Sequence, residues 1–211
     1  MRLALYGAGG TIGRRITQQA LQRGHRVTAI GRDPAKLEPP ASGLAVLRGD
    51  VLEPVGVARA VAGHDAVISA VGAGNGPSDL VVRAAHSLIE GLSRAGVRRL
   101  LVVGGAGSLE VAPGVQLVDA PDFPAEWRAP ALAHRDALAV YRTADVDWTY
   151  FSPPAILEPG ERTGRYRTGR DQLLTNADGK SRISAEDFAV ALLDEVERPR
   201  HLRERITVAD A

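Results

Sequence analysis

Short apolar runs alternate with segments of helical periodicity along most of this 211-residue chain, and this alternation restricts its fold more than any other feature. The runs are β-rich, and several end in glycine: RLALYG, HRVTAIGR, LAVLRGD, DAVISAVG and RRLLVVGG. Two segments between them, residues 11–24 and 78–96, have helical spacing and end at glycine. Continuous apolar strands alternating with helices are typical of a parallel sheet covered on both faces. The sequence therefore predicts a doubly wound α/β fold.

The regular alternation ends after residue 104. Residues 105–128 are rich in glycine and proline and hold no convincing long element, which is more typical of a functional loop than of an idle one. Further along we predict a helix over 130–145, a strand over 146–152, a small irregular lobe over 157–183, a helix over 184–197 and an edge strand over 204–209. Ser184 is the expected N-cap of the last helix, with Asp187 completing an acidic version of the capping box. Without repeats or linkers, residues 1–211 are interpreted as one domain, in which 105–128 and 153–183 form the substrate-side loops.

Composition excludes several classes of function. The net charge is +1 and aromatic residues make up only 4%, so nucleic-acid binding has no electrostatic footprint. The absence of cysteine excludes thiol catalysis and thiolate metal sites, and the five histidines show no metal-ligand spacing. No apolar stretch of about 18 residues indicates a membrane span, and no basic leader precedes the first strand. We therefore expect a cytoplasmic protein without a metal, nucleic-acid or membrane partner.

Three glycines follow the first apolar run at every third position: Gly7, Gly10 and Gly13 in YGAGGTIG. In a dinucleotide-binding loop the first permits a sharp turn, the second lets backbone approach a pyrophosphate, and the third lets the helix pack close to the sheet. The helix N-terminus adds a partial positive charge and free amides, here those of Thr11 and Ile12. A ligand-free turn can show the same spacing. The position between a strand and a helix favours a cofactor loop in a Rossmann-type fold.

The end of the second strand indicates which cofactor is bound. Proteins selective for NAD usually place Asp or Glu there to bind the ribose 2′-hydroxyl. Here the sequence AIGRDP has Gly31 and then Arg32, whose guanidinium can hold a 2′-phosphate in bidentate geometry. Arg14 adds a second positive charge at the start of the first helix. We predict NADP(H) in preference to NAD(H); the alternative is that Arg32 is a solvated loop residue beside Asp33.

Seven stretches together resemble the atypical branch of the short-chain dehydrogenase/reductase superfamily: YGAGGTIG, GRDPAKL, RGDV, VISAVG, LLVVGGAG, DWTYFSPPA and ISAEDFA. The branch includes NmrA-like proteins, biliverdin reductase B-like flavin reductases and proteins labelled as NADH-flavin reductases, and the resemblance covers essentially the whole chain. It implies that the pyrophosphate and the adenosine phosphate contact Gly7, Gly10, Thr11, Ile12, Gly13 and Arg32, with Arg14 beside them. It further implies Asp50 and Val51 at the adenine, Ala70, Val71 and Gly72 along the ribose, and Gly104, Gly105, Ser152, Pro153 and Pro154 at the nicotinamide.

One departure from this superfamily affects the chemistry. The usual catalytic pair is Tyr-x-x-x-Lys, and neither Lys36 nor Lys180 has a tyrosine four residues before it. His134 stands where the lysine is expected, and Pro130 where the tyrosine is expected. Reduction of a flavin or quinone needs mainly an aligned hydride donor, and the product can take its proton from water. We therefore predict an NAD(P)H-dependent reductase of a flat conjugated acceptor, with FMN or FAD as a candidate substrate.

Two residues are candidate catalytic groups in this hypothesis. His134 could donate a proton or hold the ribose, because imidazole titrates near neutral pH, or it could be a helix-surface residue. Ser108 could hydrogen-bond the acceptor or be a plain loop serine. Trp127 and Phe123 could cover an acceptor ring or anchor the long loop. The expected partner is a small-molecule acceptor; a homodimer, a protein partner of an NmrA-like nucleotide sensor and, less favoured, an epimerase of the extended branch stay open.

Overall fold

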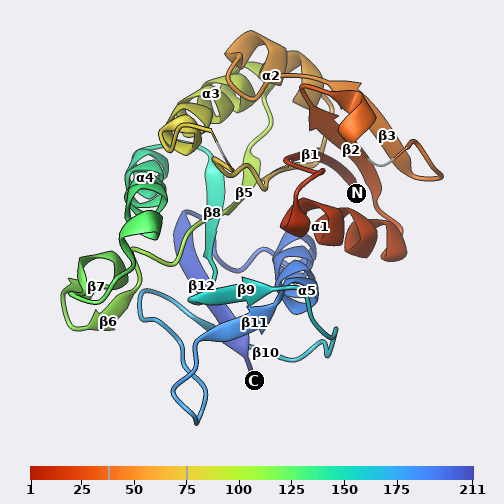
Figure 1. The fold of residues 1–211 in the computed structure, drawn as a ribbon. Helices are drawn as coiled ribbons and strands as arrows, with labels where there is room; N and C mark the ends of the chain where they lie inside the picture. The colour runs from red at the N-terminus through yellow and green to blue at the C-terminus, as the bar shows by residue number, and fades with distance from the viewer. Residues whose placement is uncertain (38, 75) are drawn as a thin grey trace.

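The computed structural model describes residues 1–37, 39–74 and 76–211, which form an eight-stranded sheet with helices on both faces (Figure 1). The strand order is β10-β12-β8-β5-β4-β1-β2-β3. The parallel strands are β1 (Arg2–Tyr6), β2 (Arg26–Gly31), β3 (Leu44–Arg48), β4 (Ala66–Ser69), β5 (Arg99–Val103), β8 (Asp147–Ser152) and β12 (Glu204–Asp210). The order reverses at β1, with β2 and β3 on one side and β4 and β5 on the other. The predicted doubly wound Rossmann-type fold is confirmed.

Burial explains why the central strands have continuous apolar sequences. Every residue of β4 is buried, as are four of the five in β1, because helices cover both faces of the sheet. One face packs against α2 (Pro54–Val61), α3 (Leu80–Ala95) and α4 (Ala125–Arg142). The other face packs against α1 (Thr11–Gln22) and α5 (Ala185–Glu197). None of the described helices combines the length and the apolar character that crossing a membrane requires.

The N-terminus of α5 departs from the expected capping box in an informative way. The hydroxyl of Ser184 accepts a hydrogen bond from the Asp187 amide at 3.0 Å, so the predicted N-cap is confirmed. The Asp187 carboxylate instead accepts from the amides of Thr163 (3.1 Å) and Gly164 (2.7 Å). Asp187 therefore ties the preceding loop to the helix.

Two expectations about the second half of the chain are wrong. Helix α4 begins at Ala125, five residues before the predicted start, and Pro130 lies inside it. Proline is favoured in the first turn of a helix, so Pro130 predicts a helix start there. The helix instead starts with the exposed residues 125–129. The predicted edge strand is β12, which β10 (Tyr166–Gly169) covers in antiparallel pairing, so β10 forms the edge.

Short elements occupy the two segments expected to be irregular. Residues 105–128 contain a hairpin of β6 (Glu110–Ala112) and β7 (Val115–Gln116), a 3-10 turn η2 (Leu117–Asp119) and the start of α4. The lobe contains β9 (Ile156–Glu158), which pairs with β11 (Arg182–Ser184), and β10. These strands are short, and all but β11 are mostly exposed, so they carry no hydrophobic alternation that would predict them.

Candidate functional site

A cavity of about 860 Å³ opens at the carboxyl ends of β1, β2 and β4, where the strand order reverses. Doubly wound sheets bind their ligands at this switch point. Of the residues predicted to hold a cofactor, those that line the cavity are Gly7, Gly10, Arg14, Arg32, Asp50, Val51, Ala70, Val71 and Gly72. The structure thus brings together the part of the prediction that concerns the adenosine and pyrophosphate.

The three glycines of the loop serve two different purposes. Gly7 has a φ of +81°, and a Cβ there would lie 2.4 Å from the carbonyl oxygen of Ala70. A Cβ on Gly13 would lie 2.1 Å from the carbonyl oxygen of Gly7, so both positions are glycine because backbone occupies the space. At Gly10 the nearest atom to a Cβ would be 3.4 Å away. Packing does not require glycine at position 10. The space that a side chain would fill there is open to a ligand in the cavity.

The first turn of α1 faces the same space. Gly10 is its N-cap, without a side-chain cap, and the first turn contains no acidic residue. The positive end of the helix dipole is therefore uncompensated by side chains and suits a phosphate. Thr11, Ile12 and Gly13 belong to this turn without lining the cavity, and Ile12 packs on the core beneath it. Their predicted contacts with the pyrophosphate stay predictions.

Three cationic side chains line the cavity: Arg14, Arg32 and Lys36. Arg14 donates from Nε to the carbonyl of Gly9 at 3.1 Å, and Arg32 forms no ion pair within the described part of the chain. Sequence reasoning missed Lys36. Its position at the cavity depends on the short 3-10 turn that Asp33 and Pro34 begin. Asp33 caps this turn by accepting from the Ala35 amide, and its other oxygen lies 3.7 Å from Lys36 Nζ.

Tyr6 supplies a polar group that the sequence did not single out. Its side chain lines the cavity at the end of β1, and its hydroxyl is buried without a hydrogen-bond partner among the described residues. Burial and the nearby carboxylate of Asp50 raise the pKa of Tyr6, so the phenol keeps its proton at neutral pH. Buried hydroxyls normally have a partner. An unpartnered buried donor on a residue that lines this cavity fits a bound dinucleotide.

The residues expected at the nicotinamide lie further along the same edge of the sheet. Gly104 and Gly105 follow β5, Ser152 ends β8, and Pro153 and Pro154 come directly after it, but none of the five lines the large cavity. A Cβ on Gly104 would lie 2.0 Å from the Tyr150 ring, and one on Gly105 would lie 2.9 Å from His134. Packing alone accounts for these two glycines. Ser152 is buried and its hydroxyl has no partner.

His134 differs from its expected chemistry. The Tyr150 hydroxyl donates to the His134 carbonyl at 2.9 Å, and Nδ1 of the ring lies 3.2 Å from the same hydroxyl oxygen. Because that hydroxyl has one proton, Nδ1 is the donor in the second contact and Nε2 is left as an acceptor. Burial lowers the pKa of His134 to about 4, which corrects the expectation of titration near neutral pH. Val71 connects the two sites, because it lines both the large cavity and the small one beside His134.

The two predicted substrate-side loops meet beside β12. The amide of Glu110 donates to the carbonyl of Asp171, and that of Leu173 donates to the carbonyl of Glu110, both at 2.8 Å. Arg205, buried on β12, donates to the carbonyl and hydroxyl of Ser108 at 2.9 Å and forms an ion pair with Asp171. Ser108 is itself buried, so this contact gives it a structural role. No local motif indicates Arg205, because its importance comes from the two loops that it joins.

A parallel sheet with a glycine turn, an open helix N-terminus and a cation-lined cavity at its switch point defines a dinucleotide-binding Rossmann protein. The chain belongs to the NAD(P)H-binding family, whose sequence profile matches residues 7–199. The likeness to atypical short-chain dehydrogenases/reductases is thereby confirmed, and the cofactor class is NAD(P)H.

Relatives share this architecture over their full length. The chain is 42% identical to the uncharacterized protein YwnB of Bacillus subtilis, over 99% of this chain and 98% of that protein. It is 38% identical to a protein from Bacteroides thetaiotaomicron provisionally described as an epimerase, with a TM-score of 0.92 over 99% and 96% of the two chains. It is 36% identical to a protein from Streptococcus pneumoniae provisionally described as an NADH-flavin reductase, with a TM-score of 0.88 over 100% of both chains.

Proposed function

We propose that this protein is an NADPH-dependent reductase that transfers a hydride to a flat conjugated acceptor such as a flavin or a quinone. His134 carries this proposal. It stands where the superfamily places its catalytic lysine, yet its pKa of about 4 keeps the ring neutral, and its Nδ1 is engaged with Tyr150. Such a group is a poor proton donor for a carbonyl oxygen at neutral pH. An acceptor that takes its proton from water does not need one.

The charges of the large cavity support NADPH as the donor. Arg14, Arg32 and Lys36 line it, and Asp50 is the one acidic residue of its lining within the described residues. The 2′-phosphate is the one group that distinguishes NADPH from NADH, and arginine can bind it through two parallel hydrogen bonds. Arg32 follows β2, the position from which the ribose of a dinucleotide is read.

In this mechanism the protein acts mainly by positioning. When bound, the dihydronicotinamide supplies the hydride, which carries two electrons to the acceptor. The glycine turn and the α1 N-terminus hold the pyrophosphate, and Val71 lies between that cavity and His134. The acceptor gains one hydride from the donor and one proton from solvent. Holding the two partners in line supplies the rate enhancement.

Trp127 supports an aromatic acceptor. Its side chain is 63% exposed, which overturns the alternative that it anchors the loop. It lies seven residues before His134 on α4, so both side chains project from nearly the same helix face, about 10 Å apart along the axis. Helix α4 connects β5 to the parallel strand β8 along the chain and packs on a face of the sheet, so its N-terminus lies toward the carboxyl ends of these strands. An indole in this position can stack on a flat ring.

The test is the oxidation of NADPH and of NADH by the purified protein with FMN, riboflavin or simple quinones. We expect turnover well above the protein-free blank, faster with NADPH. Tight NADPH binding without turnover of any acceptor would contradict the proposal and favour the NmrA-like sensor. Epimerase chemistry is less favoured because it needs the tyrosine base that this chain lacks.

A further inference from the structure

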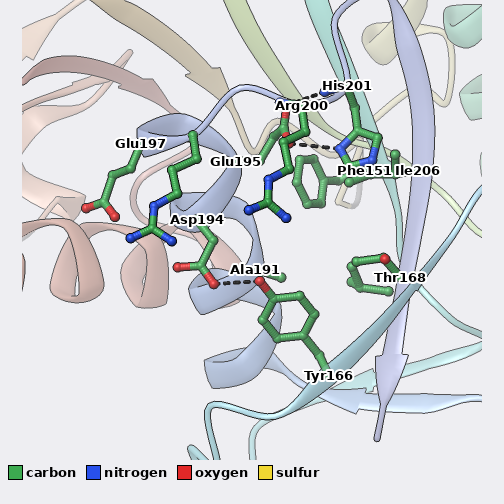
Figure 2. A pocket seen from close by; sticks show the side chains of 12 residues that line it. Phe151, Tyr166, Thr168, Ala191, Asp194, Glu195, Glu197, Arg200, His201 and Ile206 are labelled. Carbon is green, nitrogen blue, oxygen red and sulfur yellow. Dashed lines mark hydrogen bonds and ion pairs between the residues drawn. The ribbon is translucent and has the colours of Figure 1, made fainter.

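A second cavity, of about 330 Å³, lies between α5, β10 and β12 (Figure 2). It opens on the face of the sheet that α1 and α5 cover, and it shares no lining residue with the cofactor cavity. The turn between α5 and β12, which carries Arg198, Arg200 and His201, forms one of its walls. The proposed reductase has no use for this cavity.

The acidic side chains at the outer wall are already paired. Asp194 accepts from Arg23 at 2.7 Å and from the hydroxyl of Tyr166 at 2.5 Å, the second of which is drawn in Figure 2. Glu197 accepts from Arg23 at 3.0 Å, and its other oxygen lies 2.9 Å from Nε2 of His25. Both carboxylates therefore pair with Arg23, directly after α1, and Glu197 also contacts His25.

The third carboxylate, Glu195, is buried and accepts hydrogen bonds that hold the turn between α5 and β12. It accepts from Arg99 at 2.9 Å and from the backbone amides of Arg200 and His201 at 3.0 and 2.9 Å. Its second oxygen lies 2.9 Å from Nδ1 of His201. These bonds fix the backbone of the turn that carries Arg198 and Arg200.

Two cations of the lining are left without acidic partners. Arg198 and Arg200 are exposed, and neither forms an ion pair within residues 1–37, 39–74 and 76–211. Figure 2 shows the Arg200 side chain extending from the turn toward the space above Tyr166 and Ala191. Three carboxylates (Asp194, Glu195 and Glu197) face four arginines (Arg23, Arg99, Arg198 and Arg200), so the charge that remains for a ligand is positive. An anion can accept from both guanidinium groups.

The floor of the cavity has a different character. It consists of Phe151 from β8, Ile206 and Val208 from β12, and Ala191 from α5, all of them buried apolar side chains. A ring or branched alkyl group can lie above this floor, against the half-buried ring of Tyr166 that also lines the cavity, while its charged end reaches the arginines. The volume is well under half that of the cofactor cavity, which suits a small molecule and not a dinucleotide.

We propose that this cavity binds a small organic anion, in which a carboxylate or phosphate is attached to a compact apolar ring. Arg198 and Arg200 bind the anionic group, and the apolar floor contacts the ring. The two headgroups share this chemistry, and comparison of benzoate with phenyl phosphate distinguishes them.

The experiment is titration calorimetry of the full chain with benzoate and with phenyl phosphate, and with benzyl alcohol as the uncharged analogue. We expect saturable binding of at least one anion and none of the alcohol at the same concentrations. The variant Arg198→Gln/Arg200→Gln should weaken anion binding about tenfold or more, because each charge-assisted hydrogen bond contributes appreciably to affinity. The control Arg59→Gln/Arg142→Gln removes the same charge from exposed arginines outside the cavity and should leave affinity unchanged.

A third variant tests the cavity itself. Thr168 lines it from the exposed edge strand β10, so Thr168→Trp fills the space at a position that tolerates bulk and should abolish binding. No saturable binding of either anion, equal binding of benzyl alcohol, or unchanged affinity in the Arg198/Arg200 variant would overturn the proposal. All titrations are done without nucleotide, so the result does not depend on whether the protein proves to be a reductase.

Discussion

The substitution Gly10→Ala separates cofactor binding from folding. Gly10 has a φ of −77° and a ψ of 170°, a conformation open to alanine, and a Cβ there would be 3.4 Å from the nearest atom. The folded chain can accept this methyl group, and reduced freedom of the unfolded chain offsets the loss of a favoured N-cap residue. We therefore expect the free energy of unfolding to change by less than about 1 kcal/mol.

The same methyl group projects into space that the pyrophosphate needs. Forcing a methyl into a tight contact costs about 1–3 kcal/mol, which corresponds to a rise in the NADPH dissociation constant of about 5- to 150-fold. NADH should lose as much, because the two cofactors share the pyrophosphate. The assays are fluorescence titration with each cofactor and thermal unfolding without cofactor.

Gly13→Ala is the matched comparison. Its Cβ would lie 2.1 Å from the Gly7 carbonyl oxygen, so helix and loop must separate by more than 1 Å. We expect a loss of about 3 kcal/mol or more, or a fall in melting temperature of about 6–12 °C. If Gly10→Ala instead lowered stability as much as Gly13→Ala, or left both cofactor affinities intact, the assignment of Gly10 to ligand contact would be refuted.

Three further predictions test other parts of the structure. Arg32→Ala should weaken NADPH binding about tenfold and leave NADH binding nearly unchanged in the same titrations, since an exposed arginine contacts only the 2′-phosphate. Equal losses of affinity for NADPH and NADH would contradict this contact. Arg205→Met should raise the KM for the acceptor several-fold while the NADPH dissociation constant stays constant, because Ser108 and Asp171 lose their common partner; a change confined to NADPH would contradict this role. For His134 the pKa is about 4 in the folded chain against an ordinary value near 6.5, so the unfolded chain binds more protons between these values and stability falls as pH drops through that window. Denaturant unfolding of wild type and His134→Gln from pH 4 to 7 should show a weaker pH dependence in the variant, and the kcat profile of the wild type should show no His134 ionisation near pH 6.5.

The central sheet could be predicted from the sequence because its strands are buried on both faces. Such burial leaves unbroken apolar runs in β1, β4 and β5, and glycine marks their ends. Helix α2 is not predicted, because its eight residues are too few to show a helical period. Strand β10 is polar and exposed at the sheet edge, so nothing in YRTG separates it from a loop.

The candidate site likewise contains residues that the sequence predicts and residues that it does not. The glycine loop and Arg32 could be predicted, because their spacing is local and the chemistry of a phosphate requires it. Tyr6 and Lys36 could not, since their roles depend on which strand ends and turns the fold brings together. The pKa of His134 follows from burial against the Tyr150 strand, which no sequence pattern shows.

The packing of α1 on α5 has a consequence for synthesis of the chain. Helix α1 begins at the glycine turn, but its buried face rests on α5, and Arg15 and Arg23 form ion pairs with Glu186 and Asp194 at 3.1 and 2.7 Å. Residues 7–22, with the glycine turn and α1, thus leave the ribosome well before α5, the helix that α1 packs against. Until residues 185–197 emerge, the part of α1 that packs on α5 is uncovered, and a nascent chain cut short before them carries the complete glycine motif on a helix supported by the sheet alone.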